Sequence, residues 1–373
     1  MYDPYTTAYK SGTGAMDEIV GRKGDHLRLA TADAAVAPVG PGFDDVAFVH
    51  DALPEVDFDR LDPSTEFLGR RLSLPLVIAS MTGGHPEGAR VNATLARAAE
   101  RHALAMGVGS QRAALRDPRL RDTYAIAREE APTAFLLANV GAAQLVPQGE
   151  APALTTDEVA ALAAMIRADA VIVHLNALQE LVQPEGDRRA AGWLAAISRL
   201  ARDLPLPIVA KETGGGVSEV VARRLAEAGV AAIDVGGRGG TSFTAIEGLR
   251  AAERGNRRGV RLAERLADWG IPTAASVRLA ARAGLPIVAT GGVRSGIDAA
   301  RAIALGATAV GVARPLLQAV IDGGDEGVDA WLSDFREEFL AALFLTGSAT
   351  VAELARAPVV LTGATERWIN TLS

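Results

Sequence analysis

The sequence predicts an α/β fold in which eight parallel strands alternate with helices and close into a (β/α)8 barrel of the TIM type. From about residue 75 onward, a short apolar run ending in Gly, Ser, Thr or Asn recurs, and a stretch rich in Ala, Leu, Arg and Glu follows each run. The runs are apolar throughout, as expected of strands buried on both faces of a parallel sheet. Eight similar units without a break in composition favour a closed barrel over the structural alternative, a doubly wound open sheet.

The elements follow one another in strict order along the chain. The expected strands are Leu76–Ser80, Leu104–Gly109, Phe135–Gly141, Ala170–Asn176, Pro207–Glu212, Ala232–Gly237, Pro286–Gly291 and Ala307–Ala313. The expected helices are Glu87–His102, Leu120–Glu130, Thr156–Ala168, Gly192–Asp203, Ser218–Ala228, Ala274–Ala283, Ser295–Leu305 and Val328–Phe344.

Two segments lie outside the repeat. Residues 1–74 form an N-terminal extension, which we expect to cap the barrel and to contribute a substrate-binding motif. Residues 75–345 form the barrel itself, and residues 346–373 form a C-terminal tail. No linker to a second domain and no low-complexity segment interrupts this order, so we expect the extension to act together with the barrel.

The sixth connection of the barrel, Thr241–Pro272, is longer than the others. It carries four closely spaced arginines, Arg250, Arg254, Arg257 and Arg258. Long connections without clear structure are usually functional or disordered. We therefore expect this connection to be a mobile lid or an oligomer contact.

Composition excludes several classes of function. The 373-residue chain is 49% hydrophobic and 22% charged, which is a globular composition. A net charge of −7 argues against nonspecific binding of nucleic acid, and no apolar run reaches the roughly 18 residues of a membrane-spanning helix. Residues 1–15 have no hydrophobic signal core, and the absence of cysteine excludes disulfides, thiolate metal sites and cysteine nucleophiles. We expect a cytoplasmic protein that acts on a small molecule.

The last two strands predict a phosphate site. They lead into Thr290-Gly-Gly-Val-Arg-Ser295 and Gly311-Val-Ala-Arg314. Glycines allow backbone N–H groups to approach an anion, a helix N-terminus favours negative charge, and barrels often bind phosphate after strands seven and eight. Tight turns need glycine in any case, so it is the two segments together that carry this prediction.

Lysine is rare in this chain. Lys10, Lys23 and Lys211 are the only lysines, and every other basic residue is arginine. Lys211 ends the fifth strand, where a lysine can stabilise an anionic ring or act as a Schiff-base nucleophile. The alternative is an ion pair with a neighbour such as Glu212.

The fourth strand leads into the densest group of polar residues. His174 and Asn176 alternate and therefore share one face of an extended strand. Gln179 and Glu180 follow, and Gln183-Pro-Glu-Gly-Asp187 turns the chain. Glu180 is a candidate ligand for Mg²⁺, which binds through one or two carboxylates together with substrate phosphates. His174 alone would be an ordinary rim histidine, but the group as a whole predicts a site for a small phosphorylated substrate.

The N-terminal extension carries the motif Arg22-Lys-Gly-Asp-His-Leu27. Arg22, Lys23 and His26 place three cationic or titratable groups within five residues. Such a group can cap a barrel mouth and neutralise a diphosphate. The alternative is a solvated basic turn.

Six motifs occur in order between about residue 20 and about residue 345. They are Arg22-Lys-Gly-Asp-His-Leu27, Met81-Thr-Gly-Gly84, Gly109-Ser-Gln-Arg112, His174-Leu-Asn-Ala-Leu-Gln-Glu180 with Gln183-Pro-Glu-Gly-Asp187, Gly239-Gly-Thr-Ser242 and Ala289-Thr-Gly-Gly-Val-Arg294. Their combination resembles the type 2 isopentenyl diphosphate isomerase family. Other flavin barrels share the glycine motifs, whereas the first and fourth motifs do not belong to them generally.

The resemblance implies a barrel that binds FMN and interconverts isopentenyl and dimethylallyl diphosphate without net redox change. It also implies that activity needs Mg²⁺ and a reductant such as NADPH, that reduced flavin acts as acid and base on the alkene, and that the protein forms tetramers or octamers. The catalytic residues would be Gln179, Lys211 and His174. Glu180 would hold Mg²⁺ on the diphosphate.

The resemblance further assigns binding residues. FMN would contact Ser80, Met81, Thr82, Ser110, Asn139, Lys211, Thr241, Gly292, Val293, Arg294, Ala313 and Arg314. The substrate would contact Arg22, Lys23, His26, Ser110, Gln111, Arg112, His174, Asn176 and Gln179. One departure is Gly236, where many family members have serine, so one flavin contact could be looser.

Three other functions compete with this one. An FMN-dependent 2-hydroxy-acid oxidoreductase would need a catalytic histidine before the phosphate-binding glycines, but the five histidines are His26, His50, His85, His102 and His174. A dehydrogenase of the inosine-monophosphate type would need a cysteine nucleophile, which this chain lacks. A flavin-binding scaffold would not need Gln179, Glu180 and the Arg22–Lys23 pair at one mouth.

Overall fold

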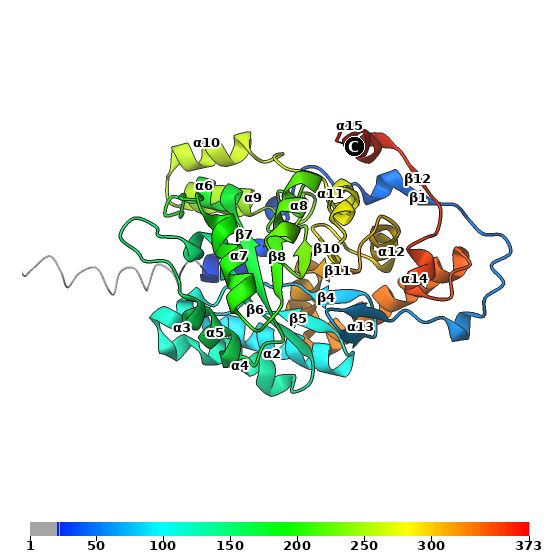
Figure 1. The fold of residues 1–373 in the computed structure, drawn as a ribbon, viewed down its shortest axis with the longest axis horizontal. Helices are drawn as coiled ribbons and strands as arrows, with labels where there is room; N and C mark the ends of the chain where they lie inside the picture. Colours follow the sequence, from blue (N-terminus) through cyan, green and yellow to red (C-terminus); the bar gives the residue numbers. More distant parts are fainter. Residues whose placement is uncertain (1–20, 22, 373) are drawn as a thin grey trace, which may run out of the picture.

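Eight parallel strands close into a barrel in the computed structural model, which describes residue 21 and residues 23–372 (Figure 1). The strands are β4 (Leu76–Ile78), β5 (Ala105–Gly107), β6 (Phe135–Gly141), β7 (Ala170–Leu175), β8 (Ile208–Glu212), β9 (Ala232–Asp234), β10 (Ile287–Thr290) and β11 (Ala309–Val312). Each pairs with its neighbour in sequence, and β11 closes the ring on β4. The predicted fold class is confirmed, and each strand begins within two residues of its expected run.

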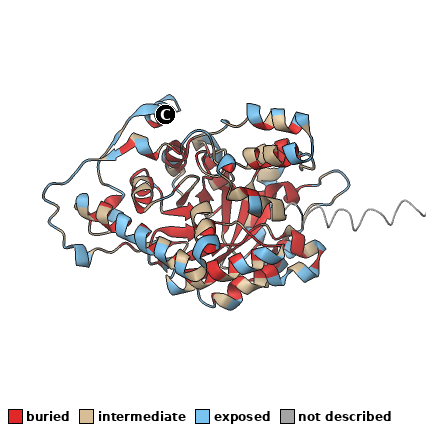
Figure 2. Ribbon diagram, turned by 180° about the vertical axis from the view of Figure 1, so that it is seen from behind, coloured by how far each residue is buried: buried red, intermediate tan, exposed pale blue. Residues whose placement is uncertain are grey.

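Helices surround the barrel and cover its strands. They are α2 (Pro86–Arg101), α3 (Arg112–Arg116), α4 (Asp122–Glu130), α5 (Thr156–Met165), α6 (Ala177–Val182), α7 (Trp193–Asp203), α8 (Glu219–Glu227), α11 (Thr273–Ala280), α12 (Gly296–Ala304) and α13 (Arg314–Leu345). Figure 2 shows that the strands are buried while the outer faces of the helices are exposed. Polar caps fix several helix starts: Thr155 and Glu158 form a capping box on α5. None of the helices in the described part of the chain is long and apolar enough to cross a membrane.

The sixth connection is a helical hairpin and not the unstructured loop expected from its length. Its helices are α9 (Phe243–Glu253) and α10 (Arg257–Arg265). Ser242 caps α9 by accepting the N–H of Ala245 at 3.1 Å, and Asn256 caps α10 by accepting the N–H of Gly259 at 3.0 Å. Such caps satisfy backbone donors that a helix start leaves free, which is why these polar residues mark helix ends here.

The last helix of the barrel is longer than predicted. The expected helix began at Val328, whereas α13 begins at Arg314, directly after β11. Gly324 interrupts α13 with φ 59° and ψ −136°, a conformation outside the helical region that glycine adopts readily. The glycine-rich composition around this kink hides the first part of the helix from sequence reasoning.

A short hairpin closes the amino-terminal end of the barrel. It consists of β2 (Thr65–Phe67) and β3 (Arg70–Leu72), and Phe67 and Leu72 join the inward-facing residues of the barrel in one buried cluster. The ring of Phe67 meets that of Phe135 edge to face, with centroids 6.0 Å apart. A second, larger cluster fills the space between the strands and the helices. The barrel is thus filled at one end and open only at the other.

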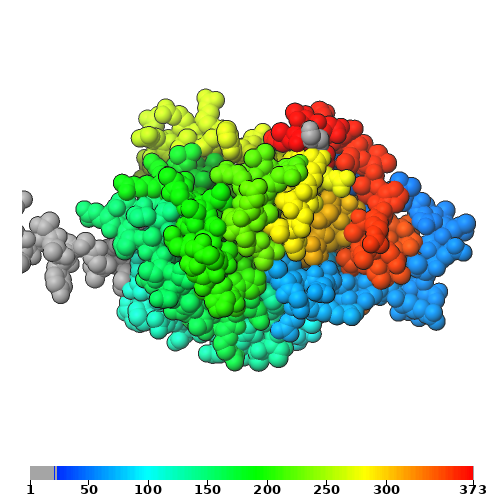
Figure 3. Space-filling view, in the orientation of Figure 1, coloured from blue at the N-terminus to red at the C-terminus, as the bar shows by residue number. Residues whose placement is uncertain are grey.

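Part of the N-terminal extension pairs with the C-terminal tail beside the barrel. In the N-terminal extension, β1 (Val46–Phe48) pairs antiparallel with β12 (Val359–Leu361) of the tail. The tail also contains α14 (Val351–Leu354) and α15 (Gly363–Thr371). Figure 3 shows these blue and red segments next to each other on the surface. A helical segment at residues 23–30 continues from the extension to the open end of the barrel.

Truncating Phe67 to alanine should destabilise the protein by about 3–5 kcal/mol, because it leaves a void in the filled end of the barrel. Equilibrium urea unfolding followed by circular dichroism measures this loss. The matched control is Leu53→Ala, because Leu53 is 79% exposed and its truncation should leave the midpoint nearly unchanged. Equal midpoints for the two variants would show that the hairpin does not contribute to the core.

Candidate active site

A cavity of about 870 Å³ opens at the carboxyl ends of the strands. It is large enough for a cofactor and a small substrate. Residues from the strand ends form its floor, and the helical segment 23–30 forms part of its rim through Lys23, His26, Leu27 and Ala30.

Nearly all residues predicted to belong to the site line this cavity. Those that do are Lys23, His26, Ser80, Met81, Thr82, Ser110, Arg112, Asn139, His174, Asn176, Gln179, Glu180, Lys211, Thr241, Gly292, Val293, Arg294, Ala313 and Arg314. Gln111 does not: its amide donates to the carbonyl of Leu162 at 2.9 Å and accepts the N–H of Asn139 at 2.9 Å. Gln111 therefore supports the end of β6 from outside the cavity. Arg22 lies outside the described residues.

Lys211 forms a buried ion pair, but with Asp234 and not with its neighbour Glu212. The Nζ of Lys211 lies 2.7 Å from Oδ2 of Asp234, which also accepts the hydroxyl of Thr290 at 3.0 Å. The register pairs Lys211 with Asp234 across β8 and β9, so the ends of the two strands place these residues side by side. Asp234 was not among the predicted site residues, although a carboxylate inside an otherwise apolar run was a usable signal.

Glu212 points into the cavity from the end of β8 and organises the loop that follows. Its Oε2 accepts the backbone N–H groups of Gly214 at 2.6 Å, of Gly215, and of Gly216 at 3.2 Å. Burial raises the pKa of Glu212 to about 7, against the opposing effect of these N–H groups. The side chain can therefore gain or lose a proton near neutral pH, a property that sequence reasoning did not assign to it.

The environment of His174 keeps its imidazole neutral. Its Nδ1 lies 2.8 Å from Oδ1 of Asn139, whose amide nitrogen donates to the carbonyl of Val108. Oδ1 of Asn139 can only accept, so Nδ1 of His174 carries the proton and Nε2 is left as an acceptor. Burial, followed by the charges of Lys211 and Lys23, lowers the pKa of His174 to about 4.

Glu180 lies within a network that folds the α6 loop back on itself. Its Oε1 accepts the amide of Asn176 at 2.8 Å, and its Oε2 accepts the N–H of Asp187 at 2.7 Å. The carboxylate of Asp187 in turn accepts Nη1 of Arg112 at 2.7 Å. Within the described residues no group of three or more His, Asp or Glu side chains could hold a metal, so Glu180 stands as a single carboxylate beside cationic groups.

Lys23 ties the N-terminal helical segment to the barrel. Its Nζ donates to the carbonyl of Gly83 at 2.6 Å, to that of Ser110 at 2.8 Å and to the hydroxyl of Tyr124 at 2.7 Å. Tyr124 is fully buried, and burial raises its pKa, so it stays protonated and donates to Ser110. Lys23 thereby places a positive charge at the cavity rim.

Glycines shape the side of the cavity formed by the last strands. Gly291 and Gly292 have φ of 114° and 79°, and a Cβ on Gly292 would lie 2.5 Å from the carbonyl oxygen of Gly239. Close to this turn lie the first residues of α13 and of α12, two helix N-termini. Gly236 is equally constrained: its φ is 45°, and a Cβ there would overlap the carbonyl oxygen of Glu212. The expected serine would not fit this backbone, which explains the departure at position 236.

Comparison with known proteins places the chain among flavin barrels. A family model described as FMN-dependent dehydrogenase matches residues 139–361. The isopentenyl-diphosphate delta-isomerase of Methanosarcina barkeri is 48% identical over 94% of this chain and 94% of its own length. The enzymes of the same name from Methanoregula boonei and Methanothermobacter thermautotrophicus are 48% and 44% identical, each over 94% of this chain and 96% of their own lengths.

Solved structures show the same architecture at lower identity. A mandelate oxidase variant with a monooxide FMN adduct superposes with a TM-score of 0.62 and 21% identity, over 94% of this chain and 99% of the other. Mandelate oxidase with (S)-2-phenylpropionate gives a TM-score of 0.60 and 19% identity, over 93% and 96%. At about 20% identity, the likeness to these mandelate oxidase structures establishes a shared fold and nothing further.

The neutral imidazole of His174 makes a contribution to stability that depends on pH. With a pKa of about 4 in the folded protein and an ordinary value of 6.5, His174 binds more protons in the unfolded chain between these values. Its contribution is complete above about pH 6.5 and is lost as the pH falls toward 4. We expect His174→Gln to flatten the fall in unfolding free energy across this window.

Urea unfolding at a series of pH values measures this effect, and titration of the imidazole C–H signals by NMR measures the pKa directly. His50→Gln is the control, because His50 is exposed and far from the charges that surround His174. If the His174 signal titrates near pH 6.5, the account of its environment is wrong.

Proposed function

Because this chain belongs to the isopentenyl-diphosphate delta-isomerase family, we propose that it uses FMN at the mouth of its barrel to interconvert isopentenyl and dimethylallyl diphosphate. The observation that carries the proposal is that one cavity has two different anion-binding sides. Glycine turns and the N-terminus of α13 form one side, and the cationic Lys23 and Arg112 belong to the other, together with His174 and the metal-ligand candidate Glu180. An enzyme with a phosphorylated cofactor and a phosphorylated substrate needs both.

The residues present fit FMN. The hydroxyl of Ser80 is buried at the cavity and has no hydrogen-bond partner among the described residues, so it is available to a ring system. The Gly291–Gly292 turn lets a phosphate approach the backbone, and the N-terminus of α13 favours its charge. Lys211 and its partner Asp234 lie at the ends of the neighbouring strands β8 and β9, where an ammonium stabilises negative charge on a reduced ring.

Bound reduced FMN would supply the acid and the base that add one proton to the alkene and remove another. The chain would contribute binding and orientation. Arg112 and Asn176 would donate to the diphosphate, Lys23 would add its positive charge, and His174 would bind it by taking up a proton on Nε2. Gln179 would position the alkene. Lys211 would keep a fixed positive charge beside the ring. His26 lines the rim, and Arg22 would extend this cationic group.

We further propose that Mg²⁺ bridges Glu180 and the diphosphate. Mg²⁺ binds through few carboxylates together with substrate phosphates, and a single buried carboxylate near Arg112 and Lys23 suits that mode. Oε1 and Oε2 of Glu180 accept the amide of Asn176 and the N–H of Asp187, and these hydrogen bonds fix the orientation of the carboxylate. The proposal also includes NADPH as reductant, a homo-oligomeric state and a cytoplasmic location.

An FMN-dependent 2-hydroxy-acid oxidoreductase is the second candidate, since mandelate oxidases share the fold. It lacks support from the site. The sequence contains no histidine after His174, so no imidazole follows β8 to take a proton from a hydroxy acid before the phosphate-binding glycines. The two candidates differ in a simple observation: a hydroxy acid would bleach the oxidised flavin, whereas isopentenyl diphosphate would not.

The decisive experiment follows isopentenyl diphosphate by proton NMR. Protein loaded with FMN, reduced with NADPH or dithionite and supplied with Mg²⁺ should form dimethylallyl diphosphate, and the oxidised protein should not. Deuterium from D₂O should appear in the product, because the reaction exchanges protons. An unchanged substrate spectrum under reducing conditions would exclude the isomerase function.

Replacing Glu180 by glutamine should raise the Mg²⁺ concentration needed for half-maximal rate by about tenfold or more, because it removes the anionic ligand. Flavin absorbance after gel filtration should be unchanged, since Glu180 lies on the other side of the cavity from the glycine turns. Glu227→Gln on the exposed face of α8 is the control. Loss of flavin from the Glu180 variant would show that the carboxylate has a structural role instead.

A further inference from the structure

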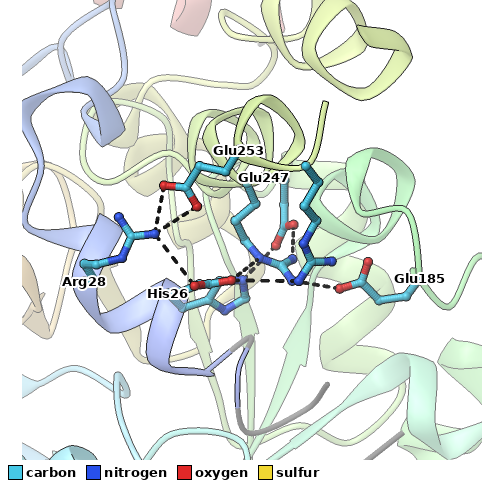
Figure 4. Close-up of polar contacts among 8 residues, drawn as sticks. His26, Arg28, Glu185, Glu247 and Glu253 are labelled. Carbon is cyan, nitrogen blue, oxygen red and sulfur yellow. Dashed lines mark hydrogen bonds and ion pairs between the residues drawn. The ribbon is translucent and has the colours of Figure 1, made fainter. Parts of the chain in front are cut away.

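A cluster of charged side chains joins three separate segments at the edge of the cavity (Figure 4). This Arg250 cluster consists of Asp25 and His26 from the helical segment 23–30, Glu247 and Arg250 from α9, and Glu185 from the loop after α6. Apart from His26, which lines the rim, its members have no role in the site described above. Arg250 was one of four arginines that the sequence marked in the sixth connection, and nothing in the sequence separated it from the others.

Arg250 contacts a carboxylate from each of the three segments. Its Nη2 lies 3.0 Å from Oε1 of Glu185, and its Nε lies 3.4 Å from Oδ2 of Asp25. Its Nη1 donates to Oε2 of Glu247 on the same helix. The other oxygen of Glu247 lies 2.8 Å from Nε2 of His26. A planar guanidinium with five donors can serve three acceptors in fixed directions, which an ammonium cannot do.

The cluster is fixed in the middle and looser at its two ends. The side chains of Arg250 and Glu247 are 2% and 0% exposed, whereas those of Asp25 and Glu185 are 29% and 22% exposed. Burial opposes ionisation of Glu247, but the contacts with His26 and Arg250 more than offset it and hold its pKa below the ordinary value. Oε2 of Glu185 is buried and has no hydrogen-bond partner among the described residues, so one contact ties this loop to the cluster. The outer contacts are therefore the ones that can open and re-form.

Each outer segment carries part of the proposed diphosphate side of the cavity. The helical segment carries Lys23, which reaches Gly83 and Ser110. The loop carries Asp187, whose N–H and carboxylate contact Glu180 and Arg112. Only Gly186 separates Glu185 from Asp187, and only Gly24 separates Lys23 from Asp25. Arg250 thus connects the two segments that meet at the mouth, although its own side chain does not line the cavity.

We propose that Arg250 is a positioning residue that latches the N-terminal segment to the α6 loop and so sets the geometry of the diphosphate-binding side. The nature of the ligand rests on the function proposed above. The latch acts in series: Asp25 contacts Arg250 and Arg250 contacts Glu185. Breaking either outer contact interrupts this path, although the His26–Glu247 and Arg28–Glu253 pairs still join the N-terminal segment to α9.

A double-mutant cycle tests this series connection. Glu185→Gln and Asp25→Asn each remove one outer charge and leave the buried Arg250–Glu247 pair intact. Each should raise KM for isopentenyl diphosphate about tenfold, with kcat reduced much less, and the double variant should be no worse than either single one. If the two losses multiply, the contacts act independently and the latch does not exist.

Glu253→Gln is the matched control. Glu253 pairs with Arg28 at 2.9 Å, so it joins the same helical segment to the same helix, with the same change of charge, but makes no contact with the α6 loop. Alone, Glu253→Gln should leave KM at the value of the natural chain. Added to Glu185→Gln, it should leave KM at the value of the Glu185→Gln variant. A tenfold rise in KM for Glu253→Gln would show that any loosening of the N-terminal segment suffices, and would overturn the role of Arg250.

Hydrogen exchange gives a readout that does not depend on isomerase activity. FMN-loaded protein with Mg²⁺ and inorganic pyrophosphate as probe should exchange the amides of residues 23–30 faster in Glu185→Gln than in the natural chain, although Glu185 does not touch that segment. Arg250→Lys, which keeps the charge without the planar fork, should do the same. Unchanged exchange in both variants would refute the latch. Coupled exchange in a chain that does not isomerise the substrate would retain the latch and refute the proposed function instead.

Discussion

The closed hydrogen-bonded ring of eight parallel strands is the constraint on which the rest of the structure depends. Because all strands run the same way, their last residues meet at one end, and residues distant in sequence become neighbours there. The register places His174 beside Lys211, and Lys211 beside Asp234. The hairpin that carries Phe67 fills the opposite end, so the polar strand ends have one place to gather, at the open mouth.

Much of this arrangement could be predicted because each piece depended on local sequence. Continuous apolar runs fixed the strands, and the residue following each run identified the rim. Lys211 stood out by its rarity. Asp234 was missed because it lies inside an otherwise ordinary apolar run, and its importance comes from Lys211 on the strand beside it. Gln111 follows the second strand as Ser110 does, but neighbouring residues point in different directions, and position alone does not give the direction of a side chain.

Other features depended on tertiary context. The polar, arginine-rich hairpin α9–α10 gave a weak pattern and was expected to be a loop. Arg250 is buried whereas Arg254, Arg257 and Arg258 are exposed, although all four belong to one short stretch. The spacing of Glu247 and Arg250 by three residues was a signal for a pair on one helix face. The carboxylates that reach Arg250 from other segments have no signature in sequence. The neutral state of His174 and the raised pKa of Glu212 likewise arise from burial and neighbours that the chain brings together only when folded.

The two sides of the mouth are built from different kinds of contact, and this has a consequence in salt solution. Backbone turns shape the side with Gly291 and Gly292, and this backbone geometry does not depend on ion pairs. Partly exposed ion pairs at Asp25 and Glu185 hold the other side together. Screening lengths shrink from about 10 Å at 0.1 M salt to about 3 Å at 1 M, so exposed pairs weaken first. Rising ionic strength should therefore weaken the ion pairs on the substrate side of the mouth and leave the backbone turns on the glycine side unchanged. The salt concentration inside the cell then sets how tightly the N-terminal segment and the α6 loop are joined.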